Sequence, residues 1–260
     1  MPVPRHFILT QLNSFNPGKS TGLDDISPRF LKDGASALAE PIGHIVNLSI
    51  LTETVPAELK RAKVVPIFKK GSRLDPGNYR PVSILSAVSK ILERAVNGQL
   101  VSHLNSRKLL YEYQSGFRSK YSTDTCLVNL TDYVKGKVNN GELVGMVMID
   151  LRKAFDTVNG DILIGKLSAM GVTSLDWFRS YLFDREQCTQ VSGKNSSFLQ
   201  ITCGVPQGSI LGPTLFLCYV NDMASCLNCH LSLYADDSAL IFSGKNASQI
   251  ASFLSQELSL

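Results

Sequence analysis

Two adjacent acids, Asp236 and Asp237, interrupt the apolar stretch "HLSLYADDSALIF" of residues 230–242. Adjacent carboxylates repel each other, and a buried carboxylate without a partner is costly. A third acid, Asp150, ends the apolar run "LVGMVMID". Such a cluster becomes tolerable when divalent cations occupy it, and two Mg²⁺ ions about 3.5–4 Å apart catalyse phosphoryl transfer. The pattern therefore predicts a two-metal site for phosphoryl transfer.

A second acid pair, Asp24 and Asp25, serves as a control within the same chain. Glycine, serine and proline flank it, which favours a turn or the start of a helix. An acid pair alone is therefore weak support for a metal site. The position of Asp236 and Asp237 between two apolar strands favours it, because only a tight turn aims neighbouring side chains at one place.

Strands must hold these acids. The run 143–150 has the length and continuous apolar character of a strand that is buried on both faces. "HLSLYA" and "SALIF" predict a hairpin around the acid pair, and "QCTQVSG" and "SFLQITCG" predict another. Apolar spacing of three and four predicts helices over 86–104 and 124–138. Further helices are expected over 160–170, 175–184 and 246–258.

The composition is that of an ordinary globular protein, with 44% hydrophobic and 18% charged residues among 260. We expect one compact unit, because no repeat, low-complexity tract or long linker interrupts the chain. No apolar run approaches the roughly 20 residues that cross a bilayer, and no signal peptide is recognisable. We therefore expect an intracellular protein without membrane contact, and the six cysteines fit a reduced compartment.

The segment "CLNCH", residues 226–230, matches the pattern for haem attachment. This is one short match, and haem attachment would also need an exported context. A zinc site would need two further ligands, which are not evident. We expect neither haem nor zinc, and we interpret the segment as a turn that enters the next strand.

Positive charge is concentrated between Lys60 and Arg80. This stretch holds seven basic residues against one acid, Asp75, a net +6, whereas the rest of the chain holds 19 bases against 21 acids. Such a patch attracts the phosphates of a nucleic acid or a nucleotide. A solvated loop with scattered lysines is the alternative.

Six blocks carry a family resemblance in their order along the chain. The sequence from about residue 17 to beyond 242 resembles the reverse transcriptases of non-LTR retrotransposons of the jockey-like kind. The blocks are "PGKSTGLDDISPRFLK", "KVVPIFKKGSRLDPGNYRPVSILSAVSKILER", "YQSGFRSKYSTDTCL", "MIDLRKAFDTV", "GVPQGSILGPTLF" and "YADDSALIF".

The resemblance implies an α+β right-hand polymerase fold, in which an antiparallel palm sheet bears the acids and helical fingers lie in front. We expect residues 1–260 to be a partial reverse transcriptase domain, with fingers mainly at 17–142 and palm mainly at 143–170 and 200–260. Because 23 residues follow Asp237 and nothing resembling an endonuclease precedes Pro17, we expect the thumb and the endonuclease to be missing. We therefore expect the chain alone to be weak or inactive.

The resemblance also implies the chemistry. Asp150, Asp236 and Asp237 match the catalytic acids, which bind two Mg²⁺ ions, with Mn²⁺ as a substitute. The backbone carbonyl of Leu151 matches a further metal ligand. The primer 3′-oxygen attacks the α-phosphate of a deoxynucleotide, and pyrophosphate leaves. The implied partners are an RNA template, a DNA primer and dNTPs.

Nucleotide contacts follow from the same resemblance. Phe155 matches the aromatic residue that leaves no room for a ribose 2′-hydroxyl, and Gln207 in the Gly-rich loop meets nucleotide and template through its amide. Asp156 is typical of the family, and we expect a structural role for it. The other implied nucleotide-binding residues are Lys69 and Arg80, whose cations suit phosphate oxygens, and Lys153 and Ala154 through their backbone N–H groups.

Template contacts are expected from Lys63, Lys70 and Arg118, and Phe117 is as readily a core residue as a stacking one. Two alternatives stay open. One is another palm polymerase such as an RNA-dependent RNA polymerase, against which Phe155 argues. The other is a non-catalytic nucleic-acid-binding relic that keeps the palm fold.

Overall fold

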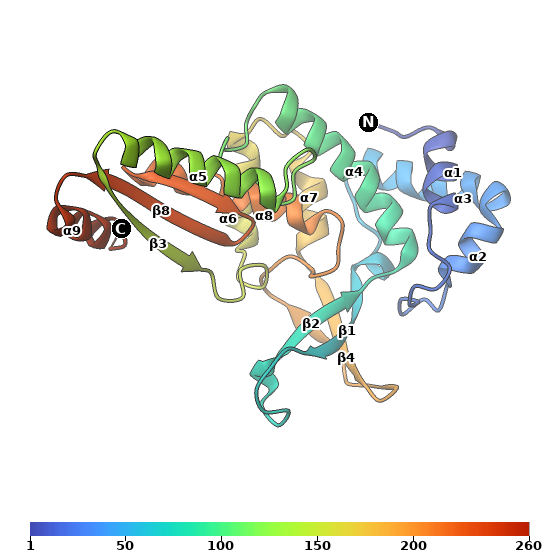
Figure 1. Cartoon of the computed structure of the whole chain (residues 1–260). Coiled ribbons are helices and arrows are strands. Elements are labelled where there is room, and N and C mark those ends of the chain that lie inside the picture. Colours follow the sequence, from blue (N-terminus) through green and yellow to red (C-terminus); the bar gives the residue numbers. More distant parts are fainter. Residues whose placement is uncertain (260) are drawn as a thin grey trace. The chain divides into compact units, whose positions relative to one another are not determined.

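The computed structural model describes residues 1–259, which form two compact units (Figure 1). The first comprises Met1–His103 and Phe155–Leu215, and the second comprises Leu104–Ala154 and the residues from Phe216 onward. The expectation of one compact unit is therefore wrong. The division was not visible in the sequence, because each unit combines two separate segments and no linker marks their boundaries. Residues of the predicted fingers and palm ranges occur in both units, and that division stays a prediction.

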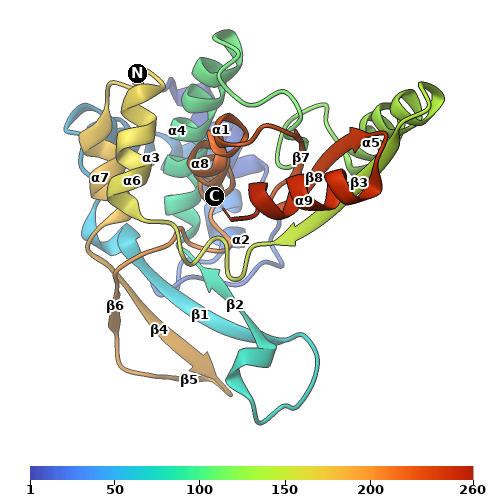
Figure 2. The same cartoon turned by 90° about the vertical axis from the view of Figure 1, so that its left-hand side faces the viewer.

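The first unit contains a sheet in the order β2-β1-β4-β5, with β6 paired to β4 (Figure 2). β1 runs antiparallel to β2 and parallel to β4. β4 also pairs antiparallel with β5 and β6, which confirms the predicted second hairpin. The strands are β1 (Arg61–Phe68), β2 (Tyr79–Ile84), β4 (Arg185–Val191), β5 (Lys194–Asn195) and β6 (Leu199–Ile201).

β1 and β2 were not predicted from the sequence. Each strand contains a proline, Pro66 or Pro81, which lacks an N–H group and weakens a strand prediction. The two prolines lie opposite each other in the ladder. Since neither can donate, they fit a non-hydrogen-bonded position of the antiparallel pair. The pairing of β1 with β4 ends at Val64, so Pro66 is not required to donate a hydrogen bond to β4 either.

Helices make up the rest of the first unit. Ser27 caps α2 by accepting a hydrogen bond from the N–H of Phe30, and Asn159 caps α6 in the same way. The core lies where buried residues of α1 face those of α3, and where the ring of Trp177 stacks on that of Tyr181 in α7. The helices are α1 (Arg5–Asn13), α2 (Pro28–Asp33), α3 (Ala35–Leu51), α4 (Ala87–Ser106), α6 (Gly160–Ala169) and α7 (Leu175–Leu182), with 3₁₀ turns at Ala57–Lys60 and Pro76–Asn78.

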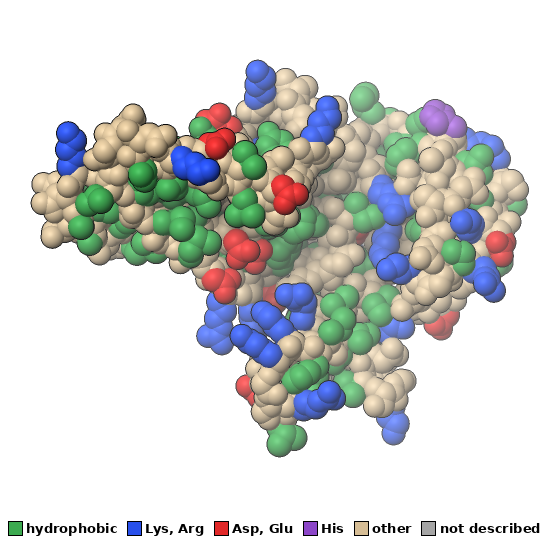
Figure 3. Space-filling view, in the orientation of Figure 1, with side chains coloured by type: hydrophobic (Ala, Val, Ile, Leu, Met, Phe, Trp, Pro, Cys, Tyr) green, Lys and Arg blue, Asp and Glu red, His purple; other side chains and the backbone are tan. Residues whose placement is uncertain are grey.

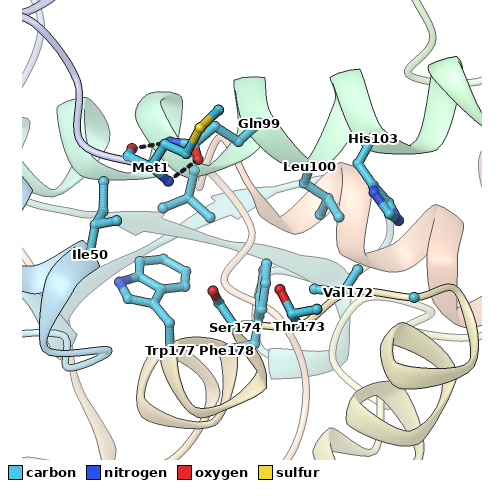
Figure 4. A pocket seen from close by; sticks show the side chains of 12 residues that line it. Met1, Ile50, Gln99, Leu100, His103, Val172, Thr173, Ser174, Trp177 and Phe178 are labelled. Carbon is cyan, nitrogen blue, oxygen red and sulfur yellow. Dashed lines mark hydrogen bonds between the residues drawn. The ribbon is translucent and has the colours of Figure 1, made fainter.

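A cavity of about 170 Å³ opens between α4 and the start of α7 (Figure 4). Trp177 and Phe178 lie on one side, and Leu100 and Gln99 lie on the other. The Gln99 amide exchanges hydrogen bonds with the backbone of Met1. The lining contains no Asp, Glu, Lys, Arg or Cys side chain, and the Nε2 of its His103 is hydrogen-bonded to the carbonyl of Met170. Nothing in this cavity therefore indicates a chemistry.

The second unit is built on an antiparallel sheet in the order β3-β8-β7. α5 packs against one face, where Tyr133 stacks on His230 at 4.0 Å between ring centroids. α9 packs against the opposite face, where its Ile250 and Leu254 join a buried cluster with Leu231. The elements are α5 (Thr123–Asn139), β3 (Leu143–Asp150), β7 (His230–Tyr234), β8 (Asp237–Gly244) and α9 (Ala247–Glu257), with a 3₁₀ turn at Met223–Cys226. α8 (Gly212–Val220) has residues in both units.

The five predicted helices, the strand at 143–150 and the hairpin around the acid pair are confirmed. The prediction that 143–150 is buried on both faces is wrong. Within the described residues β3 pairs with β8 alone and is an edge strand, and Met146 and Met148 are 49% and 64% exposed. In residues 1–259, no helix combines the length and the hydropathy of a membrane span.

Candidate active site

Asp150 and Asp237 lie directly opposite each other, as the last residue of β3 and the first residue of β8. Partners in an antiparallel ladder point to the same face, with Cβ atoms about 4.5–5.5 Å apart. Both residues are exposed, so their carboxylates meet solvent rather than a hydrophobic core. The pairing of the two strands thus brings together two of the three predicted catalytic acids.

Asp236 lies in the turn between β7 and β8. Because Tyr234 pairs with Asp237, the connection is a two-residue loop of Ala235 and Asp236. Ala235 has φ +59°, whereas Asp236 does not have a positive φ, which is the pattern of a type II′ turn. The predicted tight turn is therefore present.

The acids suit a hard cation that is not fully enclosed by protein. Among residues 1–259, no three His, Cys, Asp or Glu side chains form a ready group that could hold a metal. Mg²⁺ binds typically through one or two carboxylates, with waters and substrate phosphates completing its octahedron. Two exposed, facing carboxylates with a third adjacent in the chain fit that manner of binding.

The control pair behaves differently. Asp24 lies in a turn of the first unit, where its carboxylate accepts hydrogen bonds from Ser86 Oγ at 2.7 Å and from the N–H of Ile26 at 3.3 Å. Asp25 has φ +52°. The predicted turn is confirmed, and Asp24 has a structural role.

The residues after β3 form a run of turns. Leu151 follows Asp150 directly, and Lys153 has φ +53°. A left-handed residue within such a turn can make successive backbone N–H groups converge, which is how many anion-binding loops are built. Ala154 is buried and Lys153 is exposed. Their predicted contacts with a triphosphate stay a prediction.

Gln207 lies in the Gly-rich loop of the first unit, residues 204–213, and two hydrogen bonds position it. Its side-chain Nε2 donates to Asp156 Oδ1 at 3.3 Å, and its backbone carbonyl accepts from the N–H of Ser83 in β2 at 2.8 Å. The loop is also tied to Phe155, whose carbonyl accepts from the N–H of Val205 at 2.8 Å. Asp156, for which a structural role was expected, orients the side chain of Gln207.

Glu93 was not predicted from the sequence to have a role at this site. It is 1% exposed on α4, and its carboxylate accepts from the N–H of Ile210 at 2.6 Å and from the hydroxyl of Tyr181 at 3.0 Å. Burial raises the pKa of this carboxyl, while the Ile210 and Tyr181 hydrogen bonds and the charge of Arg185 oppose that shift. Glu93 therefore anchors the Gly-rich loop to α4. The sequence feature by which Glu93 could have been found is an acid inside an apolar helical pattern.

The predicted phosphate contacts of the first unit gather on the β1–β2 hairpin. Lys63 and Arg80 lie on the same face, because their ladder partners alternate regularly from Lys63↔Ile84 to Ile67↔Arg80. Lys69 and Lys70 follow β1 and are exposed. Figure 3 shows Lys and Arg side chains gathered over this hairpin, in the lower part of the view. The basic stretch is thus one positively charged surface of the first unit.

Arg118 is engaged within its own segment. Its Nη1 donates to the carbonyls of Tyr111 and Gln114, each at 2.9 Å, and its guanidinium lies 4.3 Å from the ring centroid of Tyr121. Those contacts give it a structural role, and its template contact stays a prediction. Phe117 is 54% exposed and is not a core residue.

The segment 226–230 enters β7 as predicted. A 3₁₀ turn ends at Cys226, and β7 begins at His230, which stacks on Tyr133. Burial lowers the pKa of His230, and the charge of Glu112 opposes this shift.

An antiparallel sheet with acids at one strand end and in the adjoining hairpin turn is the arrangement expected of a palm-type nucleotide polymerase. Comparison with protein families agrees with this class: residues 67–258 match the family described as reverse transcriptase (RNA-dependent DNA polymerase). The chain belongs to the reverse transcriptase family.

Its relatives are proteins of mobile elements. The chain is 31% identical to a probable RNA-directed DNA polymerase from transposon BS of Drosophila melanogaster, over 99% of the chain and 30% of that protein. It is 29% identical to the RNA-directed DNA polymerase from mobile element jockey of the same species, over 93% of the chain and 27% of that protein. A Pol polyprotein from retrotransposable element R2 of Popillia japonica is 28% identical over 71% of the chain. The chain spans less than a third of the length of these relatives.

Proposed function

We propose that this chain is the polymerase portion of an RNA-directed DNA polymerase of a non-LTR mobile element. In this function it adds dNTPs to a primer 3′-hydroxyl as directed by an RNA template. The observation that carries the proposal is the facing pair of Asp150 and Asp237 beside the turn that holds Asp236. Membership in the reverse transcriptase family supports the choice of substrates.

The metal ligands in this proposal are the carboxylates of Asp150, Asp236 and Asp237, with the backbone carbonyl of Leu151. When bound there, two Mg²⁺ ions, or Mn²⁺ in their place, activate the attacking oxygen and stabilise the leaving one. The acids contribute negative charge and hard oxygen donors in a solvent-exposed position. A nucleoside triphosphate can therefore enter the site, and pyrophosphate can leave it, without crossing a hydrophobic core.

The other side chains select and orient the nucleotide. Arg80 and Lys69 offset the charge of the triphosphate, and the backbone N–H groups of Lys153 and Ala154 bind its oxygens. The ring of Phe155 excludes a ribose 2′-hydroxyl, and the amide of Gln207, oriented by Asp156, contacts the nascent base pair.

The template lies along the β1–β2 hairpin, where Lys63 and Lys70 contact its phosphates. Arg118 is a further candidate for contact with the template. Because these contacts are to phosphates, binding should weaken steeply as salt concentration rises. Because they do not read bases, affinity should vary little with template sequence. All six cysteines are free, which supports an intracellular site of action.

Primer extension on an RNA template tests the proposal directly. Incorporation by the chain alone should be weak, should favour dNTPs over rNTPs, and should require Mg²⁺ or Mn²⁺. Asp237→Asn and Asp150→Asn should abolish incorporation, whereas the matched control Asp25→Asn should leave it unchanged. An active Asp237→Asn variant would refute the assignment of the site. RNA binding with neither incorporation nor any response to Mg²⁺ would instead favour a non-catalytic nucleic-acid-binding protein.

Metal binding can also be measured without turnover. A ligand that binds only the folded state stabilises it by RT ln(1 + [L]/Kd), which is about 2.7 kcal/mol at 100 times Kd. Mn²⁺ should therefore raise the unfolding free energy of the parent protein and of Asp25→Asn, but not that of Asp237→Asn. Equal stabilisation of all three proteins would contradict the proposed ligands.

A further inference from the structure

The segment 113–116 runs along the outer edge of β7, up to the turn that carries the acids. The N–H of Leu233 donates to the carbonyl of Tyr113 at 3.0 Å, and the N–H of Ser115 donates to the carbonyl of Leu233 at 2.9 Å. Gln114 and Leu233 form a parallel bridge. A short piece of chain far from the hairpin in sequence thus reaches its turn.

Gln114 uses its whole side-chain amide on this turn. It is 2% exposed, and its Oε1 accepts from the N–H of Ala235 at 2.9 Å and from the N–H of Gly116 at 2.8 Å. Its Nε2 donates to the carbonyl of Ala235 at 3.3 Å. One side chain therefore satisfies both backbone polar groups of the first turn residue.

Gly116 brings the backbone itself against the same residue. A Cβ atom at position 116 would lie 2.1 Å from the backbone nitrogen of Ala235 and 2.6 Å from its Cα. Such distances exclude any side chain larger than that of glycine, so the two backbones are in direct contact. The turn is therefore packed directly against the backbone of segment 113–116.

Ala235 needs that support because its φ of +59° is unfavourable for a residue with a Cβ atom. A non-glycine residue in this region costs of order 1–3 kcal/mol and persists only where its surroundings enforce it. The conformation of Ala235 in turn sets the direction of Asp236 and Asp237, the next two residues. A change at Ala235 would therefore rotate two of the three proposed metal ligands.

We infer that Gln114, backed by Gly116, is the positioning residue of the metal-binding turn: it holds Ala235 so that Asp236 and Asp237 face the cation. The inference rests on the proposed function, since it assigns a use to the same three acids. Gln114 contacts neither metal nor substrate in this arrangement. It acts through backbone groups, as residues behind metal ligands commonly do.

The test compares Mn²⁺ binding, measured by the relaxation of water protons, in four forms of the full chain. These are the parent protein, Gln114→Met, Asp237→Asn and the control Gln190→Met. Methionine keeps the length of the glutamine side chain without its amide, and Gln190 bonds Asn195 on an exposed hairpin of the first unit. Gln114→Met should weaken Mn²⁺ binding about 10–100-fold, the usual effect of losing a partner behind a metal ligand. Excess Mn²⁺ should restore the parent stoichiometry, and Gln190→Met should bind as the parent does.

The outcomes separate the inference from the proposed function. Parent-like affinity in Gln114→Met, together with loss of binding in Asp237→Asn, would overturn the inference and leave the proposed function standing. If the parent protein shows no Mn²⁺ binding that is lost in Asp237→Asn, both the inference and the proposed function are overturned. The comparison with Gln114→Met requires that this variant folds, so a second measurement uses the parent protein alone. Its Ala235 amide should exchange with solvent far more slowly than an unprotected amide, and fast exchange would overturn the inference.

Discussion

Asp150 and Asp237 occupy opposite positions of one antiparallel ladder, so two like charges share one face at the end of β3. Like charges directly opposite each other are destabilising in a sheet. The sequence therefore accepts a local cost at this point, where an apolar or neutral pair would be more stable. Such a cost is typical of sites that are kept for function rather than for folding.

Asp237→Asn should consequently stabilise the metal-free protein. Removing one of the two facing charges should raise the free energy of unfolding by about 0.2–1 kcal/mol, and the gain should shrink as salt screens the repulsion. Urea unfolding of parent and variant at low and high NaCl measures both effects. A variant that is less stable than the parent at low salt would mean that the Asp237 carboxylate makes a net favourable contact.

The contact between Asp156 and Gln207 predicts a specific kinetic effect. Asp156→Ala removes the acceptor that holds the Gln207 amide, and a lost hydrogen bond of about 0.5–1.5 kcal/mol should raise KM for dNTP about 2–10-fold. kcat should change less, because the proposed metal ligands belong to the other unit. Asp156→Asn keeps an oxygen acceptor and should restore KM. Steady-state incorporation kinetics on one RNA template compare KM and kcat of the parent, Asp156→Ala and Asp156→Asn. Asp176→Ala, which removes an exposed carboxyl, is the control.

Two glycine substitutions, one in the Gly-rich loop and one in α4, should have opposite effects on stability. Gly204 has φ +92°, and a Cβ atom there would lie 2.8 Å from the carbonyl oxygen of Asp156, so Gly204→Ala should destabilise the protein by about 1–3 kcal/mol. Gly98 lies within α4 with open space around its Cβ position, so Gly98→Ala should stabilise it by about 0.5–1 kcal/mol. Chemical denaturation measures both. Equal effects of the two substitutions would show that the tight fit of Gly204 is not maintained in solution.

The hairpin that carries Asp236 and Asp237 could be predicted because its signals are local. Alternating and continuous apolar runs identified β3, β7 and β8, and the acids stood out where those runs ended. Their facing arrangement then followed from the antiparallel pairing of neighbouring strands. The exposure of β3 could not be predicted, because it depends on which elements cover its faces and not on its own composition.

The supporting residues could not be found in this way, since their partners are distant in the sequence. Gln114 lies 121 residues before Ala235, and Glu93 lies 117 residues before Ile210. Each looks like an ordinary polar residue until the fold buries it. The prolines of β1 and β2 caused a different error, because a rule that holds for single strands does not anticipate two prolines placed opposite each other.

Glu93 predicts a pH dependence of stability. Burial raises its pKa above the ordinary value of 4.5, so the folded state binds the proton more tightly than the unfolded state does. Its contribution to stability is therefore fully present below about pH 4.5 and is lost as pH rises through the folded pKa. Glu93→Gln keeps an acceptor for the N–H of Ile210 but cannot titrate.

We therefore expect the parent to lose stability relative to Glu93→Gln as pH rises above 4.5. The difference is the unfolding free energy of the parent minus that of the variant. Urea unfolding between pH 4 and 8 (about the range in which the fold is expected to persist) measures the difference. Glu40→Gln, which removes an exposed carboxyl from α3, controls for the loss of one negative charge. A difference that increases with pH would mean that the hydrogen bonds from Ile210 and Tyr181 and the charge of Arg185 outweigh burial, and that the carboxylate form anchors the loop.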